Sequence, residues 1–348
     1  MTTRTRSLEN LRARRNPEGL LKEAYASIQE DDPVQYLLGA MEPVEPSFTK
    51  KTYEEGERVA KQISSGLAIA RLNAEYEYQG SVTKNTHIKA YSDIDLLVLE
   101  TRFYSVEPPQ PAPNPYNGNP VTDLFQIRQI CIKHLRSAFP TAKVDDLGSK
   151  SVKLSGGSLV RTVDIVPANW YDTNEYALRR LKHLRGVHVL DSHKMERISD
   201  QPFLHGAYID HKDHKTQDST KKLIRLLKSL KYDSENKDTM SSYDIESIVF
   251  QMNDTQMQKP RGEEIPLAHA CWIWLKTIED NQQLRSELSV PDGKRKIFVE
   301  GKATLSQLKA LRSELEGLLY DIELGLRRSM RKLAEAKVKW PSSGVINL

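Results

Sequence analysis

The sequence predicts an α+β protein with a mixed α/β first half, ending near residue 200, and a helical second half. Strand-like apolar runs occur in the first half, at residues 95–99, 151–154 and 159–166. From about Ser219 onward, apolar residues recur three and four positions apart, which is the spacing of an amphipathic helix. No apolar run approaches the roughly 18 residues that a membrane-spanning helix requires. We therefore expect a globular protein built from two different halves.

Composition and charge narrow the classes of function. The 348 residues include 51 Lys and Arg against 47 Asp and Glu, a net charge of +4 that falls well short of a dedicated nucleic-acid binder. The two cysteines, Cys131 and Cys271, are too few for a disulfide framework or a four-cysteine zinc site. The first residues lead into no apolar segment of the kind found in secretory signals. These features predict a cytoplasmic protein that does not associate with membranes.

The first half opens with a predicted helix over residues 51–78, in which apolar residues follow the helical period. This helix would deliver the chain to Gly80. Residues 95–99 are almost all apolar and predict a buried strand. No regular element can cross the proline-rich segment 108–120, so we expect a surface loop there, and we considered it as a flap over a site.

A helix over residues 124–139 and two further strands complete the predicted first half. The strands cover residues 151–154 and 159–166. Gly156 and Gly157 lie between them and predict a tight hairpin turn, because such turns need residues with positive φ.

The second half is predicted to be mostly helical. Segments 223–230 and 243–251 have helical patterns, and Thr304 with Gln307 forms a candidate capping box at the start of the last helix. The apolar stripe of that helix runs over residues 308–333. Such a stripe is typical of a core or a seam between helices.

Three carboxylates are predicted to share one face of the sheet. Asp93 and Asp95 open the strand at 95–99, and residues two apart in a strand point the same way. Asp164 lies in a later strand that can run beside it. Clustered carboxylates repel one another unless they share a cation, and Mg²⁺ prefers oxygen ligands while leaving positions open for phosphate oxygens. For each motif alone, surface acids at the mouth of a strand remain the alternative.

A turn of small residues precedes the carboxylates. Gly80 and Ser81 come about a dozen residues before Asp93. Backbone N–H groups in such a turn, with the Ser81 hydroxyl, can hold a triphosphate. Taken alone this pair could be an ordinary turn, but the order Gly-Ser, Asp-x-Asp and a distant Asp is much more specific than its parts.

The combined motifs resemble the signature of polymerase-β-type nucleotidyltransferases. Gly80-Ser81-x-x-x-x-Thr86 is followed by Ser92-Asp93-Ile94-Asp95-Leu96. In the second half, segments 223–230, 240–244 and 290–298 resemble the bacterial cGAS/DncV-like nucleotidyltransferases (CD-NTases), relatives of the oligoadenylate synthases. The resemblance covers roughly residues 50–335 and implies a two-lobed fold: a polymerase-β-like core, with a twisted mixed sheet and flanking helices, plus a C-terminal helical bundle. The implied domains are an N-terminal helical extension (1–50), a nucleotidyltransferase core (51–205), a helical lobe (206–340) and a tail (341–348).

The resemblance also implies roles for single residues of the core. Asp93, Asp95 and Asp164 match the catalytic acids that hold two Mg²⁺ ions, which Mn²⁺ can replace. Gly80 and Ser81 match the phosphate-holding turn.

Three further residues match nucleotide-binding positions, and Asn169, shortly after Asp164, is an additional candidate. Lys228 falls where the family places a helix lysine on the donor triphosphate, and a solvated lysine is its alternative. Ser242 matches a phosphate-contacting serine. Tyr243 matches an aromatic ring that stacks on a nucleobase, with a core tyrosine as the alternative. Asn169 would touch a base edge or, alternatively, form a turn.

The resemblance implies a second-messenger synthase that joins NTPs, ATP and/or GTP, into a cyclic di- or trinucleotide with release of pyrophosphate. It also implies bacterial antiphage (CBASS) signalling, in which the product acts on a separate effector and CBASS accessory proteins are candidate partners. The chain lacks the cysteines of the zinc ribbon in the animal DNA sensor, so activation by duplex DNA is not expected. The alternatives are a template-independent RNA or tRNA nucleotidyltransferase and a catalytically silent nucleotide-binding module. The bases, the linkages and the ring size stay open at this level.

Overall fold

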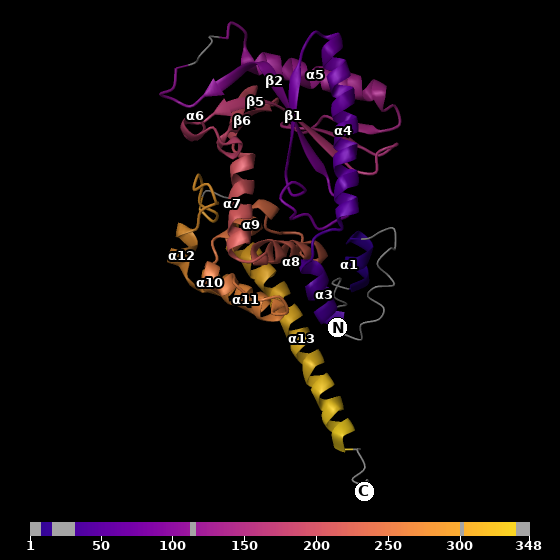
Figure 1. Cartoon of the computed structure of the whole chain (residues 1–348), viewed down its shortest axis with the longest axis vertical. Coiled ribbons are helices and arrows are strands. Elements are labelled where there is room, and N and C mark those ends of the chain that lie inside the picture. The colour runs from indigo at the N-terminus through magenta and orange to yellow at the C-terminus, as the bar shows by residue number, and fades with distance from the viewer. Residues whose placement is uncertain (1–7, 16–31, 112–115, 300–302, 339–348) are drawn as a thin grey trace, which may run out of the picture.

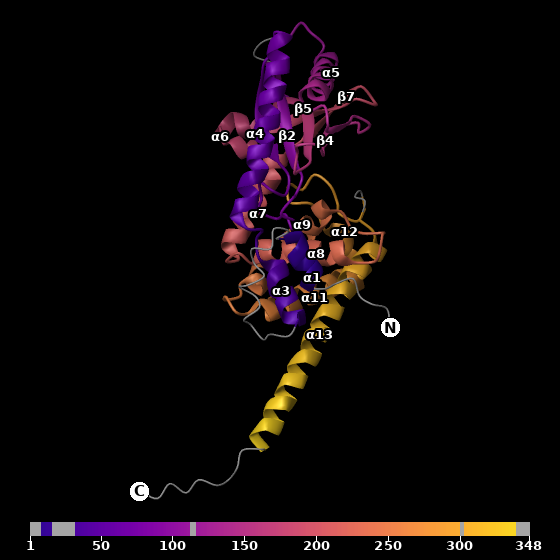
Figure 2. The same cartoon turned by 90° about the vertical axis from the view of Figure 1, so that its right-hand side faces the viewer.

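The structure, a computed structural model that describes residues 8–15, 32–111, 116–299 and 303–338, has two lobes (Figures 1 and 2). One lobe is a sheet with helices across it, and the other is a bundle of helices. This arrangement confirms the predicted two-lobed α+β class. The sheet lobe contains α4 (Pro46–Ile69), β1 (Ala74–Gln79), β2 (Ile94–Val106), α5 (Pro120–Ala138), β3 (Lys143–Asp145), β4 (Val152–Ser155), β5 (Val163–Asp172), α6 (Asn174–Arg179), β6 (Gly186–Asp191) and β7 (Glu196–Asp200).

Helices from both ends of the chain build the second lobe. The helix α7 (Pro202–Lys215) leads into it from the sheet lobe (Figure 1). The remaining helices are α1 (Leu8–Arg15), α3 (Asp32–Met41), α8 (Ser219–Asp233), α9 (Ser242–Phe250), α10 (Asp254–Met257), α11 (Glu264–Asp280), α12 (Gln282–Glu287) and α13 (Leu305–Val338).

Within the described residues, seven strands form one mixed sheet. The strand order is β1-β2-β5-β4-β3, with β6 paired to the far part of β5 and β7 paired to β6. The central strands β2 and β5 run parallel, and the other pairs are antiparallel. Leu96 and Val98 of β2 pack toward α4 and α5, whereas Leu97 and Leu99 pack on the opposite face. Burial on both faces explains why this strand reads as a continuous apolar run.

The predicted helix over residues 51–78 is wrong at both ends. Helix α4 starts earlier, at Pro46, and ends at Ile69. The chain then passes Arg71, which has a φ of +58°, and forms the strand β1, so a strand and not a helix leads to Gly80. The alternation of Tyr76 and Tyr78 with glutamates follows the two-residue period of a strand, and pairing with β2 decides the outcome.

The proline-rich loop lies at the opposite end of β2 from Asp93. The strand spans 13 residues, which at about 3.3 Å per residue is roughly 40 Å. In the described part of the loop, Gln110 donates a hydrogen bond to Asn174 (2.9 Å), near the far end of β5. The interpretation of this loop as a flap over the predicted site is therefore wrong, although its residues 112–115 lie outside the described part of the chain.

The predicted hairpin around Gly156 and Gly157 is confirmed as a pair of strands with a turn at the glycines, but the turn does not join the strands directly. Strands β4 and β5 pair antiparallel, both glycines have positive φ, +75° and +61°, and Leu159 N–H donates to the Gly156 carbonyl (3.1 Å). The connection takes residues 156–162, and within it Leu159 is buried in the core that the sheet shares with α4 and α5. Strand β5 also continues past its predicted end, to Asp172.

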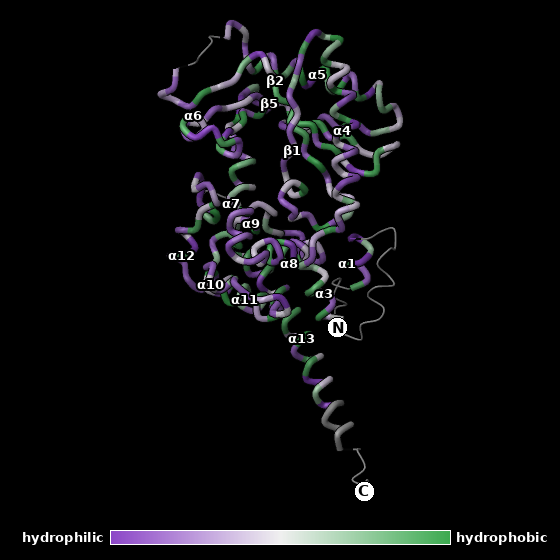
Figure 3. The backbone as a smooth tube through the Cα atoms, in the orientation of Figure 1, coloured by the Kyte–Doolittle hydropathy of each residue, from purple (hydrophilic) through white to green (hydrophobic). Residues whose placement is uncertain are grey.

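The helical lobe has its own apolar core, centred on α8. The predicted helix over residues 223–230 is confirmed, but all eight residues are buried, polar ones included, whereas an amphipathic helix would leave one face exposed. Leu11 of α1 and Leu37 of α3 pack into the same core, so the described helices of the predicted N-terminal extension belong to this lobe. In Figure 3, where the backbone is coloured by the hydropathy of each residue, apolar residues (green) occur along the sheet and along the helices around α8.

The long helix α13 follows the prediction only along its first part. The capping box is confirmed: Gln307 N–H donates to the Thr304 hydroxyl (3.2 Å), and the Gln307 side chain accepts from Thr304 N–H (3.1 Å). The apolar stripe is buried as far as Ile322, but Leu326 and Met330 are exposed where the helix leaves the lobe (Figure 1). The side chain of Leu333 and the predicted tail 341–348 lie outside the described residues. Among the described residues, no helix is both long enough and apolar enough to cross a bilayer.

Candidate active site

The parallel pairing of β2 and β5 brings the predicted carboxylates together. Asp95 lies directly beside Asp164 in the register of the two strands, and Asp93 immediately precedes β2. Lys153, on the next strand β4, is the register partner of Asp164. Its ammonium lies 3.5 Å from the Asp164 carboxylate and 3.7 Å from that of Asp93. The carboxylates thus meet at one end of the two central strands, with a lysine between two of them.

The surroundings of Asp95 and Asp164 disfavour the ionised forms of these two carboxyl groups. Burial, then the charges of Asp164 and Asp93, raises the pKa of Asp95 to about 6. Burial likewise raises the pKa of Asp164, against the opposing charge of Lys153. The buried oxygen Oδ1 of Asp164 has no hydrogen-bond partner among the residues that the structure describes. A cation placed here would relieve the repulsion and satisfy that oxygen.

The donor set fits a hard divalent cation. All three side chains offer only carboxylate oxygens, the ligands that Mg²⁺ and Mn²⁺ take. As the described side chains lie, no three His, Cys, Asp or Glu residues are grouped tightly enough to hold a metal ion. Lys153 is instead the cation between Asp93 and Asp164, so it would have to yield its place when a metal binds.

The Gly80-Ser81 turn is locked against the carboxylates. Gly80 has a φ of +91°, and a Cβ at this position would lie 2.2 Å from Oδ2 of Asp95. The following loop is held by hydrogen bonds from Thr83 Oγ1 to the Gly80 carbonyl (2.9 Å) and from Thr86 N–H to the Ser81 carbonyl (3.0 Å). Only glycine therefore permits both the backbone conformation and the close approach to Asp95.

A cleft of about 480 Å³ separates this end of the sheet from the helical lobe. Its lining unites seven residues that the sequence predicts for the site. They are Ser81, Asp93, Asp95, Asp164, Lys228, Ser242 and Tyr243. Gly80 adjoins the lining through Ser81 and Asp95.

The helical wall of the cleft is the beginning of α9. Ser241 caps this helix by accepting a hydrogen bond from Asp244 N–H (3.0 Å), which leaves Ser242 as its first residue, exposed on the cleft. The ring of Tyr243 stacks on His205 with centroids 4.5 Å apart, and the Arg295 guanidinium lies 5.3 Å from its centroid. Tyr243 is thus a half-buried ring at the cleft wall, and its stacking on a nucleobase remains a prediction.

Lys228 approaches the cleft from α8. Its side chain is buried, which lowers the pKa of its ammonium to about 8 despite the opposing charge of Glu246. The distance from Lys228 Nζ to Glu246 Oε1 is 3.5 Å. This lysine is therefore not a solvated surface residue, and it can change charge near neutral pH.

Asn169 is not brought to the cleft. It lies within β5, not in a turn, and is fully buried. Its amide donates to the Ser105 hydroxyl (3.2 Å) and accepts from Arg197 (3.1 Å). The prediction that Asn169 touches a base edge is wrong for this arrangement, because the strand runs on beyond Asp164 and carries Asn169 away from the acids.

The sequence reasoning missed several residues of the cleft. Lys84 follows the Gly-Ser turn by three residues, and Glu246 lies one helical turn after Tyr243, so both spacings could have pointed to them. Two residues behind the lining were missed as well: His205, which contacts Glu246, and Lys153, which contacts Asp164, belong to segments without any motif. The lining also includes the exposed rings of Tyr91 and Tyr232.

A sheet end with carboxylates on neighbouring central strands, facing a helical lobe across a cleft, is the arrangement that the sequence predicts for a two-lobed nucleotidyltransferase. Residues 207–320 match the family model of the cGAS/DncV-like nucleotidyltransferase C-terminal helical domain. A cyclic dinucleotide synthase CdnE from Yersinia aleksiciae is 36% identical over 285 residues, covering 80% of this chain and 74% of the relative. A c-di-GMP synthase from Capnocytophaga granulosa is 30% identical and covers 89% of this chain and 97% of the relative. The chain therefore belongs to the bacterial cGAS/DncV-like nucleotidyltransferases.

A solved structure extends this likeness over both lobes. The STING-associated CdnE c-di-GMP synthase from Capnocytophaga granulosa superposes with a TM-score of 0.74 at 29% identity, over 90% of this chain and 97% of the other. The protein is thus a nucleotidyltransferase whose relatives are cyclic dinucleotide synthases.

Proposed function

We propose that this protein is a cyclic dinucleotide synthase that acts by two successive nucleotidyl transfers. In each transfer, a ribose 2′- or 3′-hydroxyl oxygen of one nucleotide bonds to the α-phosphorus of another. The bond from that phosphorus to the β-phosphate breaks, pyrophosphate leaves, and the hydroxyl proton passes to a carboxylate or to water. The observation that carries the proposal is the cleft in which Asp93, Asp95 and Asp164 face the lysine Lys228.

The carboxylates supply the metal-binding side of the reaction. Asp93, Asp95 and Asp164 would hold two Mg²⁺ ions, for which Mn²⁺ can substitute. When bound, these ions would neutralise charge on the hydroxyl and phosphate oxygens. The chain itself contributes the fixed juxtaposition of Asp95 with Asp164, which the backbone pairing of β2 and β5 sets.

Other groups that line or adjoin the cleft supply hydrogen-bond donors and positive charge for the triphosphate. The Gly80-Ser81 turn offers backbone N–H groups, and Lys84 and Lys228 offer ammonium groups. Ser242 adds a hydroxyl at the N-terminus of α9, where the helix dipole favours an anion. Together these groups orient the α-phosphate toward the carboxylates.

The lowered pKa of Lys228 predicts how triphosphate binding depends on pH. Below about pH 8 the ammonium is present, and it is lost as the pH rises through that value. We expect the affinity for a non-hydrolysable GTP analogue, measured by calorimetry, to fall above pH 8. Lys228→Met should weaken binding at pH 7 by about 10- to 100-fold, which corresponds to the loss of one charged hydrogen bond. In this variant the affinity should no longer fall as the pH rises above 8. An unchanged pH profile in Lys228→Met would contradict the assignment.

The relatives guide the choice of substrate and partner. Because the relative from Capnocytophaga granulosa is a c-di-GMP synthase, we propose GTP as the first substrate to test, with ATP second. That relative's solved structure is described as STING-associated, which supports a separate effector that responds to the product. On this basis we propose a role in CBASS antiphage signalling, with accessory proteins as further partners.

The product assay tests the proposal directly. The purified chain is incubated with all four NTPs and Mg²⁺ or Mn²⁺, then treated with phosphatase and analysed by mass spectrometry. We expect a phosphatase-resistant cyclic dinucleotide, whose mass identifies the bases. Label transfer that occurs only when tRNA or other RNA is added would replace the proposal with the RNA transferase alternative. No product in either assay would favour the catalytically silent module.

A further inference from the structure

Glu246 gathers contacts from both lobes at the back of the cleft. Its carboxylate accepts hydrogen bonds from Lys84 (2.6 Å) and Thr86 (3.0 Å), which belong to the loop after Gly80. From the helical lobe, His205 Nε2 lies 2.9 Å away on α7, and Lys228 Nζ lies 3.5 Å away on α8. A single side chain of α9 therefore joins the phosphate-side loop to two helices of the other lobe.

Burial makes this carboxylate depend on its partners. The Glu246 side chain is only 3% exposed, and an unpaired charge buried to this degree costs several kcal/mol. Burial alone would raise its pKa, but the His205 hydrogen bond and the charges of Lys84 and Lys228 hold that pKa well below the ordinary value. Glu246 therefore stays ionised across the working pH range.

The charges of Glu246, Lys84 and Lys228 do not cancel one another, and the excess is positive. One carboxylate is shared by the two ammonium groups of Lys84 and Lys228, so the cluster keeps an excess positive charge. Both lysines line the same cleft as the carboxylates of the sheet. Without Glu246 the two ammonium groups would repel each other, and the buried Lys228 would give up its proton more easily.

We propose that Glu246 is a positioning residue that holds Lys84 and Lys228 in place for the triphosphate of a bound nucleotide and couples the Gly80-Ser81 loop to the helical lobe. The inference rests on the proposed function, since it deepens the role of the same cleft. Glu246 itself needs no contact with the nucleotide, because its acceptor oxygens are already engaged by the cluster.

The loop has a second attachment that should keep the fold intact without Glu246. Arg225 on α8 donates a hydrogen bond to the Asn85 carbonyl (2.8 Å) and another to the Met41 carbonyl (2.7 Å). Removing the Glu246 charge should therefore disturb the lysines more than the docking of the two lobes.

The test is binding of inorganic tripolyphosphate and of a non-hydrolysable GTP analogue by calorimetry between pH 6 and 9. For Glu246→Gln we expect affinity about 10- to 100-fold lower at pH 7.5, the usual range when a residue that orients binding groups is lost. With the Glu246 charge removed, the main charged neighbour groups of Lys228 are Lys84 and Lys231, with His87 also nearby. The affinity should therefore begin to fall at a lower pH than in the wild type. Glu246→Asp keeps the charge and should recover part of the affinity.

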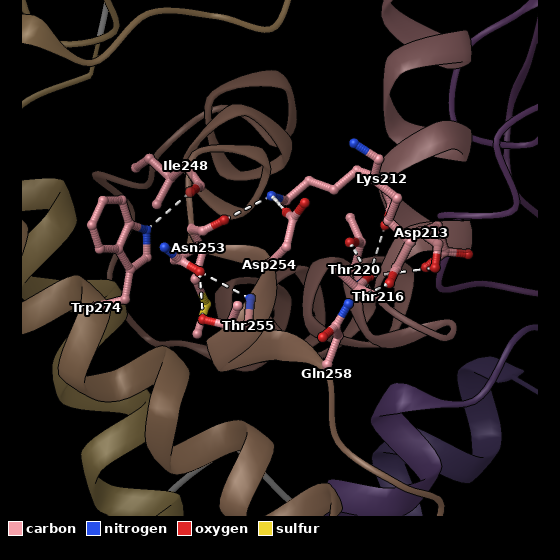
Figure 4. A network of polar contacts seen from close by, with 12 residues as sticks. Lys212, Asp213, Thr216, Thr220, Ile248, Asn253, Asp254, Thr255, Gln258 and Trp274 are labelled. Carbon is pink, nitrogen blue, oxygen red and sulfur yellow. Dashed lines mark hydrogen bonds and ion pairs between the residues drawn. The ribbon is translucent and has the colours of Figure 1, made fainter.

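A matched control comes from the polar network at the other end of α9 (Figure 4). There the buried Lys212 of α7 donates to the Met252 carbonyl (2.7 Å) and pairs with Asp254 of α10. None of these residues lines the cleft. Asp254→Asn should lower the melting temperature while leaving tripolyphosphate affinity and its pH profile unchanged.

The outcomes separate this inference from the proposed function. Affinity of Glu246→Gln within twofold of wild type at every pH would overturn the positioning role, whether or not the wild type makes a cyclic product. If Glu246→Gln does not fold, Glu246→Asp decides: its side chain is one methylene shorter and cannot keep all four contacts, so wild-type affinity in that variant would overturn the positioning role. A wild type that binds tripolyphosphate but makes no cyclic product would refute the proposed function alone.

Discussion

Replacing Asp93 and Asp95 together by asparagine is expected to abolish product formation while preserving the fold. The double variant keeps the shape of both side chains but removes two of the three charges that would hold the metal ions. Charge stabilisation by such ions is worth several kcal/mol, so the rate should fall by about 1,000-fold or more. The measurement is the initial rate of pyrophosphate release with GTP and Mg²⁺.

Stability provides the internal check on this variant. The raised pKa of Asp95 means that the folded chain binds its proton more tightly than the unfolded chain does. The folded state therefore loses stability as the pH rises from about 4 to 6, and this loss persists at pH 7. Without divalent cations, the double variant should consequently melt at the same temperature as wild type or higher. A lower melting temperature would mean that the carboxylates serve the fold.

Asp172→Asn is the matched control for the loss of a carboxylate. Asp172 lies on β5, the strand of Asp164, but at its far end, where it pairs with Arg185. It does not line the cleft. Its variant should keep pyrophosphate release within about twofold of wild type, since distant sites act independently. Equal loss in both variants would contradict the assignment of the acids.

Gly80→Ala is expected to cause the second-largest effect. An alanine there must adopt a φ of +91° and would place its Cβ 2.2 Å from an Asp95 oxygen. The backbone strain alone costs about 1–3 kcal/mol, and the clash must displace either the turn or Asp95. Because both belong to the cleft, we expect the rate of product formation to fall by more than about 100-fold.

Gly262→Ala is a control that separates the effect of backbone strain from the effect of the clash with Asp95. Gly262 has nearly the same φ, +92°, but a Cβ there meets no atom within 4 Å. Both variants should therefore lose stability in a thermal melt through the strain, Gly80→Ala more than Gly262→Ala because of the added clash, whereas only Gly80→Ala should lose activity. If Gly80→Ala retains wild-type activity, the close contact between the turn and Asp95 has no part in the reaction.

In the sheet lobe, the sequence predicted the positions of the motif residues more accurately than the bounds of the helices and strands. The carboxylate pair and Asp164 could be located because strand periodicity and spacing are local properties, and the structure places them side by side. The prediction that the helix continues through residues 74–78 was wrong, because pairing with β2 outweighs the local helical pattern there. The prediction for Asn169 was wrong for a related reason: only the structure shows that β5 continues as one strand past Asp164 and carries Asn169 away from the carboxylates.

The sequence alone determined the two-lobed class, the family and the three carboxylates at the sheet, because motif order and hydrophobic period can be read from consecutive residues. The tertiary structure decided which residues meet across the cleft. The contacts of Glu246 join positions 41 to 162 residues apart, excepting Lys228 at 18, and no local pattern encodes them. The physical reason is that a buried charge is stabilised by whichever partners the packing of the lobes brings within reach.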